Sequence, residues 1–200
     1  MTSNGSFIAI DGVDGAGNTS HSQLLAEWVT KSLGLKTLLT KEPTEKPIGL
    51  LIREYLRKPR TPSTTDALLF AADRIEHVEN VIKPALAKGL VVISDRYVES
   101  SIAYQSVQGL PIDWLISINR HAMKPSLNII LDIEPDRSLA RKKELVEKFE
   151  VASFLRKVRE VFLSRAKSED YPVVDTGGSL HGAQNTIRTI VQSFLRKSGL

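Results

Sequence analysis

One segment near the amino terminus constrains the fold of this chain more than any other. A short apolar run over residues 7–11 has the length and composition of a buried strand. It leads directly into a turn that contains Gly12, Gly15 and Gly17, and a Thr-Ser pair and a helical pattern follow. Because glycines can take positive φ and let the backbone approach a ligand closely, the segment predicts a strand, a tight turn and a helix in direct succession.

The turn has the frame of a phosphate-binding P-loop, G-x-x-x-x-G-K-[ST], with Gly12, Gly17 and Thr19 in register. Successive N–H groups of such a loop form a concave site for anions, and the helix that follows adds its dipole. An ordinary glycine-rich turn is the alternative, but the strand, the spacing, Thr19 and the helix together favour the phosphate loop. The segment therefore predicts a nucleotide enzyme.

Asn18 stands where this motif has its lysine. An amide can donate one or two hydrogen bonds to a phosphate oxygen, but it brings no charge. The loop therefore lacks the cation that usually lies near the β- and γ-phosphates. In an active enzyme, we expect another cation to take its place.

The length of 200 residues suits one domain, residues 1–200, and the composition is that of a soluble globular protein, with 42% hydrophobic and 25% charged residues. No apolar run has the length of a membrane span, and the short polar amino terminus lacks the regions of a signal peptide. There is no cysteine, which excludes disulfides and thiolate zinc sites. We therefore expect a cytoplasmic protein without a membrane partner.

The formal net charge is +4, and lysine and arginine gather in two segments, residues 53–60 and 137–148. A solvated, mildly basic surface accounts for this balance, and a basic cleft for polyanionic nucleotides is the alternative. A nucleic-acid partner is not expected, because only 6% of the residues are aromatic and no nucleic-acid-binding module is visible.

Strands and helices alternate along the chain. Short apolar runs predict buried strands at residues 7–11, 37–41, 90–95, 127–132 and 172–175. Helical patterns cover residues 22–33, 48–56, 65–88, 112–123, 137–146, 149–167 and 182–197. Pro84 is expected to kink the third of these helices or to shift its register. The order predicts an α/β fold in three layers, a five-stranded parallel sheet flanked by helices, with ligands beyond the carboxyl ends of the strands.

A second block of candidate functional residues follows the strand at 90–95. Asp95 ends that strand, where it can hold Mg²⁺ together with the hydroxyl of Thr19. Arg96 carries a planar, permanently charged guanidinium that can bind phosphate. Tyr104 and Gln105 offer a flat ring and an amide. The alternative is a strand-end aspartate that caps the next helix, with Arg96 as its partner.

In these motifs the chain resembles the thymidylate kinase family, P-loop enzymes that phosphorylate dTMP to dTDP with ATP. Similar segments run in the family's order along nearly the whole chain: DGVDGAG at 11–17, KEP at 41–43, PIG at 47–49, LLFAADR at 68–74, HV at 77–78, PAL at 84–86, VISDRY at 92–97 and AYQ at 103–105. The resemblance implies a P-loop nucleoside monophosphate kinase fold, ATP and dTMP as substrates, Mg²⁺ as cofactor and a homodimer.

The resemblance also assigns roles to single residues. The implied ATP-binding residues are Gly12, Val13, Asp14, Gly15, Ala16, Gly17, Asn18 and Thr19. The implied dTMP-binding residues are Asp14, Arg53, Phe70, Arg74, Arg96, Ser101, Tyr104 and Gln105. The implied metal ligands are Thr19 and Asp95, and the implied catalytic residues are Asp14, Arg96, Arg141 and Lys148.

Within the implied dTMP site, Phe70 stacks on the thymine ring and Arg74 contacts the base. Asp14 accepts the 3′-hydroxyl, and Arg96, helped by Arg53, holds the monophosphate. Tyr104 lies under the deoxyribose at C2′, and Ser101 and Gln105 face the base edge. By pattern alone Phe70 fits the core and Arg74 fits an ion pair with Asp73 or a glutamate of its own helix. His77, one turn after Arg74, is interpreted as structural.

The family carries a mobile, basic lid after the strand that ends at Asp132, here at about residues 136–150. Members without a basic residue early in the P-loop supply catalytic arginines from this lid, and Val13 and Ala16 indicate that type. The usual Asp-Arg pair of the lid is Glu147-Lys148 in this chain. The cations expected to compensate for Asn18 are therefore Arg141, Lys142, Lys143 and Lys148. A solvated basic helix face is the alternative.

Two other functions stay open at this point. One is a kinase of the same fold with different or broader acceptor use, because Ser101 and Thr44 do not decide specificity. The other is a nucleotide-binding regulator with little catalysis, which Asn18 favours and the retained site residues oppose.

Overall fold

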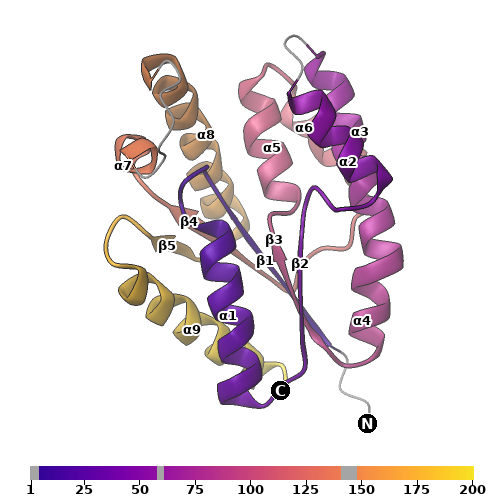
Figure 1. The fold of residues 1–200 in the computed structure, drawn as a ribbon, viewed down its shortest axis with the longest axis vertical. Coiled ribbons are helices and arrows are strands. Elements are labelled where there is room, and N and C mark those ends of the chain that lie inside the picture. Colours follow the sequence, from indigo (N-terminus) through magenta and orange to yellow (C-terminus); the bar gives the residue numbers. More distant parts are fainter. Residues whose placement is uncertain (1–4, 58–60, 141–147) are drawn as a thin grey trace.

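The computed structural model describes residues 5–57, 61–140 and 148–200. Five parallel strands form a single sheet in the order β2-β3-β1-β4-β5 (Figure 1). Their bounds are β1 Ser6–Gly12, β2 Thr37–Lys41, β3 Val91–Asp95, β4 Leu127–Asp132 and β5 Val173–Asp175. The five predicted strands and their parallel arrangement are confirmed, with each boundary within one residue.

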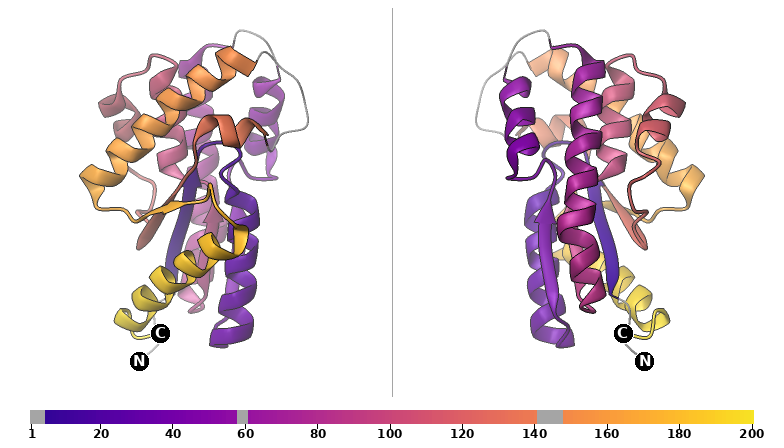
Figure 2. Two further views of the ribbon diagram at one scale, coloured as in Figure 1. Left: turned by 90° about the vertical axis from the view of Figure 1, so that its left-hand side faces the viewer. Right: turned by 90° about the vertical axis from the view of Figure 1, so that its right-hand side faces the viewer.

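Helices cover both faces of the sheet (Figures 1 and 2). They are α1 Asn18–Leu33, α2 Pro47–Leu56, α3 Ser63–His77, η1 Val78–Ile82, α4 Lys83–Ala87, α5 Val98–Val107, α6 Ile112–Ile118, α7 Pro135–Ala140, α8 Lys148–Glu169 and α9 Leu180–Lys197. In the described part of the chain, no helix combines the length and the apolar character that crossing a membrane requires.

Alternation along β1 divides the interior into two cores. Ile8 and Ile10 pack on one side with side chains of α1, α8 and α9, whereas Phe7 and Ala9 pack on the other with η1 and α4. Every residue of β1 is buried, because the strand lies in the middle of the sheet and is covered on both faces. This is the predicted three-layer arrangement.

Three helix predictions differ from the structure. Helix α1 starts at Asn18, four residues before the predicted start, because the carbonyl of Gly17, its N-cap, already accepts the N–H of His21 at 2.9 Å. Helix α6 ends at Ile118 rather than at residue 123. Helix α5 was not predicted, because Glu99, Ser101 and Gln105 are buried and hide the apolar stripe by which a helix is identified.

The predicted register shift before Pro84 is confirmed. Residues Val78–Ile82 form a π-helical turn, in which the N–H of Lys83 donates to the carbonyl of Val78, five residues earlier. Proline has no N–H to give to the carbonyl of Asn80, so the ordinary helical ladder is interrupted at this place.

The carboxyl ends of β2, β3 and β1 lie side by side and hold the candidate residues together. The N–H of Glu42 donates to the carbonyl of Asp95 at 3.1 Å, and the N–H of Arg96 donates to the carbonyl of Ile10 at 2.9 Å. The residues that follow three separate strands are therefore brought to one edge of the sheet, the edge at which parallel α/β folds bind their ligands.

Gly49, in the first turn of α2, tests the packing of the segment that joins β2 to α2. A Cβ atom at this position would lie 2.0 Å from the carbonyl oxygen of Thr44. We expect Gly49→Ala to lower the free energy of unfolding by about 1–3 kcal/mol, because backbone must move to make room. Denaturant unfolding measures this loss. Gly178→Ala is the control, since nothing lies within 4 Å of its Cβ, and an equal effect of both variants would contradict the argument.

Candidate active site

The P-loop has the conformation that its glycines predict. Gly15 and Gly17 have φ values of 84° and 90°, and the N–H of Ala16 donates to the carbonyl of Val13 at 3.0 Å. The loop and the first turn of α1 border a cavity of about 480 Å³. The residues around it are Gly15, Gly17, Asn18, Thr19, Ser20, His21, Arg96, Thr176 and Leu180.

Asn18 is buried and directs its amide into the loop itself. Its Nδ2 lies 3.2 Å from the carbonyl oxygen of Gly12 and 3.3 Å from that of Val13. The amide nitrogen is thus engaged by backbone carbonyls. In this conformation Asn18 holds the loop closed rather than presenting a donor to a phosphate.

Thr19 and Asp95 meet, as the sequence predicts. The hydroxyl of Thr19 donates to Oδ2 of Asp95 at 2.5 Å. The other oxygen of Asp95, Oδ1, is buried without a hydrogen-bond partner among the described residues, and burial raises the pKa of this carboxyl. A hydroxyl beside an unsatisfied carboxylate oxygen at the edge of a phosphate loop suits Mg²⁺, which prefers oxygen ligands.

Arg96 ties the end of β3 to the P-loop. Its Nη2 lies 2.7 Å from Oδ1 of Asp14, and its Nη1 donates to the carbonyl of Gly12 at 3.0 Å and to the hydroxyl of Ser100 at 3.1 Å. The backbone of Arg96 has φ 70°, a left-handed conformation that costs free energy in any residue with a Cβ atom. Such strain persists where the surrounding contacts demand it, which is typical of functional sites.

Tyr104 completes this arrangement. Its hydroxyl accepts the N–H of Asp14 at 2.8 Å, and the guanidinium of Arg96 lies 5.6 Å from the centre of its ring. Burial raises the pKa of the Tyr104 phenol, so the hydroxyl stays protonated. Tyr104 therefore supports the P-loop from the side on which α5 lies.

A second cavity, of about 260 Å³, opens on the other side of Asp14 and Arg96. It is bordered by Asp14, Glu42, Pro43, Leu56, Asp66, Phe70, Arg74, Arg96, Tyr97, Ser100, Ser101, Tyr104, Gln105 and Gln108. We call it the acceptor cavity. Seven of the eight residues that the resemblance implies for dTMP border it, and Phe70 is one of them rather than a core residue.

Arg53 is the eighth, and it does not border the acceptor cavity. Its guanidinium donates to the carbonyls of Pro43, Thr44 and Gly49, at 2.6, 2.5 and 3.1 Å. In this conformation Arg53 therefore secures the segment that joins β2 to α2.

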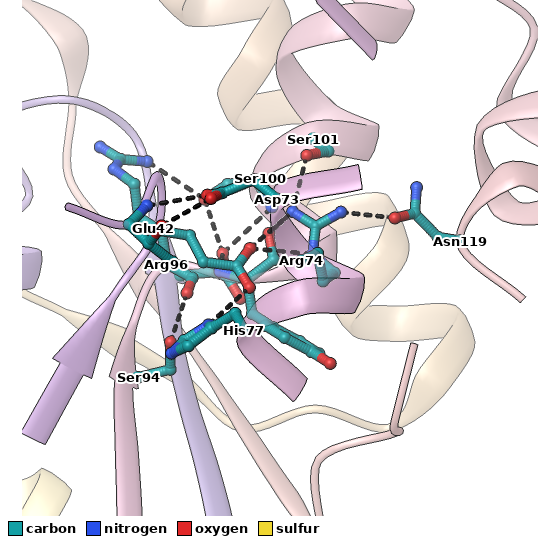
Figure 3. A network of polar contacts seen from close by, with 12 residues as sticks. Glu42, Asp73, Arg74, His77, Ser94, Arg96, Ser100, Ser101 and Asn119 are labelled. Atoms are coloured by element: carbon teal, nitrogen blue, oxygen red, sulfur yellow. Dashed lines mark hydrogen bonds and ion pairs between the residues drawn. The ribbon is translucent and has the colours of Figure 1, made fainter. Parts of the chain in front are cut away.

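Arg74 is almost fully buried, with 1% of its surface exposed, and pairs with Glu42 rather than with Asp73 or a glutamate of its own helix. Asp73 instead accepts the N–H and the hydroxyl of Thr44. Asn119 and Ser101 accept further hydrogen bonds from the Arg74 guanidinium (Figure 3). Arg74 is thus fixed at the border of the acceptor cavity by partners from several elements.

Sequence reasoning missed several supporting residues. Asp11, predicted only as part of the motif at 11–17, accepts the backbone N–H groups of Tyr97 and Ser100 through Oδ1 and thereby holds the start of α5. Glu42 entered the sequence analysis only as part of the motif at 41–43. Asn119, the C-cap residue of α6, carries no sequence signal at all.

The predicted lid lies partly outside the described residues. Arg141, Lys142 and Lys143 fall there, whereas Lys148 is the first residue of α8. Helix α8 is fastened to the end of β4, because Arg159 donates to both carboxylate oxygens of Asp132, at 2.6 and 2.9 Å.

Comparison with known proteins connects this geometry to a family. A family model described as thymidylate kinase matches residues 10–187. A probable thymidylate kinase of Pyrobaculum calidifontis is 48% identical over 174 residues, which cover 86% of this chain and 88% of the relative. Probable thymidylate kinases of Thermococcus onnurineus and Pyrococcus abyssi are each 41% identical, over 96% of this chain and 99% and 98% of their own lengths. The chain therefore belongs to the thymidylate kinase family.

Proposed function

We propose that this protein transfers the γ-phosphoryl group of ATP to dTMP and releases dTDP and ADP. One observation carries the proposal: Arg96 borders both the P-loop cavity and the acceptor cavity. A phosphate in each cavity would meet at this guanidinium. Phosphoryl transfer depends on such positioning and on charge stabilisation more than on covalent chemistry.

The P-loop cavity receives the phosphates of ATP in this proposal, and the acceptor cavity receives dTMP. Phe70 offers a ring face for stacking on thymine, and Arg74 offers its guanidinium to the base edge, with Ser101 and Gln105 nearby. Asp14 accepts the 3′-hydroxyl, Tyr104 lies under the sugar, and Arg96 binds the monophosphate. Arg53 acts through the segment that it holds, between β2 and α2.

We assign Thr19 and Asp95 as the residues that hold Mg²⁺. When bound, the ion neutralises charge on the β- and γ-phosphates. We also propose that Arg141 and Lys148 supply the positive charge that Asn18 does not, and that closure of the lid excludes water and so limits hydrolysis of ATP.

A homodimer fits the surface of the molecule. Large apolar side chains are 38 to 52% exposed on α3 and on two helices that each pack against it, α2 and α6. They are Leu50, Leu51, Leu68, Ile112 and Ile116. We propose that they form the interface between two copies, and that the dimer works in the cytoplasm on ATP and dTMP, without nucleic acid or membrane.

The acceptor preference tests the proposed function. We expect dTMP to be the best acceptor, dUMP to be weaker, and ribonucleotides such as UMP to be poor. The missing methyl group weakens contact with the pocket by about tenfold or more, and the 2′-hydroxyl meets the Tyr104 ring. A coupled kinase assay across a panel of nucleoside monophosphates measures kcat/KM for each. Equal values for UMP and dTMP would contradict the role given to Tyr104.

Replacement of Arg96 separates binding from backbone strain. Arg96→Ala should raise the KM for dTMP about 10- to 100-fold, because a charge-assisted contact is lost, and should change ATP binding much less. Arg96→Gly should lose as much function yet unfold with a free energy about 1 kcal/mol higher than Arg96→Ala, since glycine tolerates φ 70°. Steady-state kinetics and denaturant unfolding measure both effects. A loss of folding in Arg96→Ala without a selective effect on dTMP would make the residue structural.

The P-loop asparagine and the lid form one testable pair. Arg141→Ala or Lys148→Ala should lower kcat about 10²-fold while changing ATP affinity much less, and Asn18→Lys should restore part of that loss. Single-turnover kinetics on the single and double variants measure this coupling.

Asn18→Ala is the control, because it breaks the bonds to the loop carbonyls without adding a charge. If all four lid cations can be replaced singly without loss, the compensation idea fails, and if no monophosphate is turned over, the protein is a nucleotide-binding regulator.

A further inference from the structure

Behind the acceptor cavity, four side chains are hydrogen-bonded in series. The hydroxyl of Thr40 lies 2.7 Å from Nε2 of His77, and Nδ1 of His77 lies 3.0 Å from Oε1 of Glu42. The other carboxylate oxygen of Glu42 accepts from Nε of Arg74 at 2.8 Å. We call Thr40, His77, Glu42 and Arg74 the buried relay, in which Thr40 is half-buried and the other three are buried. Figure 3 shows His77, Glu42 and Arg74 within it.

The chemistry of the groups sets the direction of the bond to Glu42. A carboxylate only accepts, so Nδ1 of His77 carries the hydrogen that Glu42 receives. Nε2 accepts the hydroxyl hydrogen of Thr40 when the ring is neutral and donates to the Thr40 oxygen when the ring is protonated, so His77 is bonded to Thr40 in either form. His77 therefore restrains one oxygen of Glu42, while Arg74 engages the other.

Burial makes these contacts decisive for Arg74. Glu42, Arg74 and His77 are each at most 5% exposed, so water does not replace a lost partner easily. A buried guanidinium keeps its place only where its counter-ion and its hydrogen-bond acceptors are themselves fixed. The position of Arg74 thus depends on Glu42, and the position of Glu42 depends on His77.

The partners of Arg74 leave little of it for a ligand. Nε and Nη2 both lie 2.8 Å from Oε2 of Glu42, Nη2 also donates to Ser101 at 2.9 Å and to the carbonyl of Tyr97 at 3.3 Å, and Nη1 donates to Asn119. Among the described residues, these hydrogen bonds account for four of the five N–H groups of the guanidinium, and Arg74 borders the acceptor cavity. Because a guanidinium donates and cannot accept a hydrogen bond, a contact of Arg74 with the base edge favours a keto oxygen over an amino group.

We propose that His77, backed by Thr40, is a positioning residue that fixes Arg74 through Glu42 and so sets the selection of keto over amino bases in the acceptor cavity. The inference rests on the proposed function, because it concerns the same acceptor. It assigns to His77 a role in base selection, where its sequence position indicated a structural residue.

Four variants test the buried relay. His77→Leu removes both ring nitrogens, whereas His77→Asn keeps an N–H that can reach Glu42. Thr40→Val removes only the hydroxyl behind His77. Thr37→Val is the matched control, because Thr37 lies on the same strand and its hydroxyl pairs with Thr30, outside the relay.

We expect His77→Leu to raise the KM for dTMP about 10- to 100-fold, the effect of freeing a hydrogen-bonded charged group, with the KM for ATP changed less than about twofold. The ratio of kcat/KM for dTMP over dCMP should fall by a similar factor. His77→Asn should recover most of both losses. Thr40→Val should shift both in the same direction by about two- to tenfold, and Thr37→Val should shift neither.

Kinetics, dTMP calorimetry and denaturant unfolding on the same proteins separate the outcomes. A folded His77→Leu variant with the native KM for dTMP and the native dTMP over dCMP ratio would overturn the inference, whatever its stability, and leave the proposed function standing. Binding of dTMP that weakens in His77→Leu, without turnover by any variant, would support the buried relay and overturn the proposed reaction. If His77→Leu does not fold, Thr40→Val and His77→Asn test the inference by the same two quantities, the KM for dTMP and the ratio of kcat/KM for dTMP over dCMP.

Discussion

The contact between Arg96 and the P-loop organises the rest of this site. The guanidinium reaches from the end of β3 to Asp14 and to the carbonyl of Gly12, and so joins two strands that are far apart in sequence. The backbone of Arg96 adopts a strained, left-handed conformation, with φ 70°, at this place. The same side chain borders both cavities, so in the proposed reaction it would set the distance between the two phosphates.

Buried or half-buried ion pairs with two-point contacts recur around this centre. Glu99 receives two hydrogen bonds from Arg165 at 2.9 Å each, and Asp132 receives two from Arg159. These hydrogen bonds hold the pKa of Arg159 and of Arg165 above the usual value. The first pair joins α5 to α8 and the second joins β4 to α8. Planar arginine–carboxylate pairs fix direction as well as distance, and so they hold the helices that carry the site in a defined orientation.

The strands of this fold could be predicted from sequence because burial on both faces leaves a continuous apolar run, as in β1 and β4. Helix α5 could not, because it turns polar side chains such as Glu99 and Gln105 inward, where ion pairs and cavity walls use them. Most of the residues proposed to bind dTMP border one cavity. They could be predicted because the family motifs place them after particular strands. The hydrogen-bond partners of these residues could not be predicted from the sequence. The pairing of Arg74 with Glu42, and of Arg53 with backbone carbonyls, depends on how α3 and α2 pack. Asn119 enters the site only through the tertiary structure.

Asn18 affects nucleotide binding and the rate of phosphoryl transfer in different ways. Its amide bonds the carbonyls of Gly12 and Val13, so in the proposed reaction the loop would already have its shape when the phosphates of ATP arrive. A preformed cradle of backbone N–H groups contacts ground state and transition state alike, which lowers the substrate concentration needed without raising the rate. A lysine acts differently, because its charge follows the charge that develops on the migrating phosphoryl group. In the proposed reaction, this loop therefore contributes to the affinity for ATP, and the increase in the rate of phosphoryl transfer has to come from charges outside the loop.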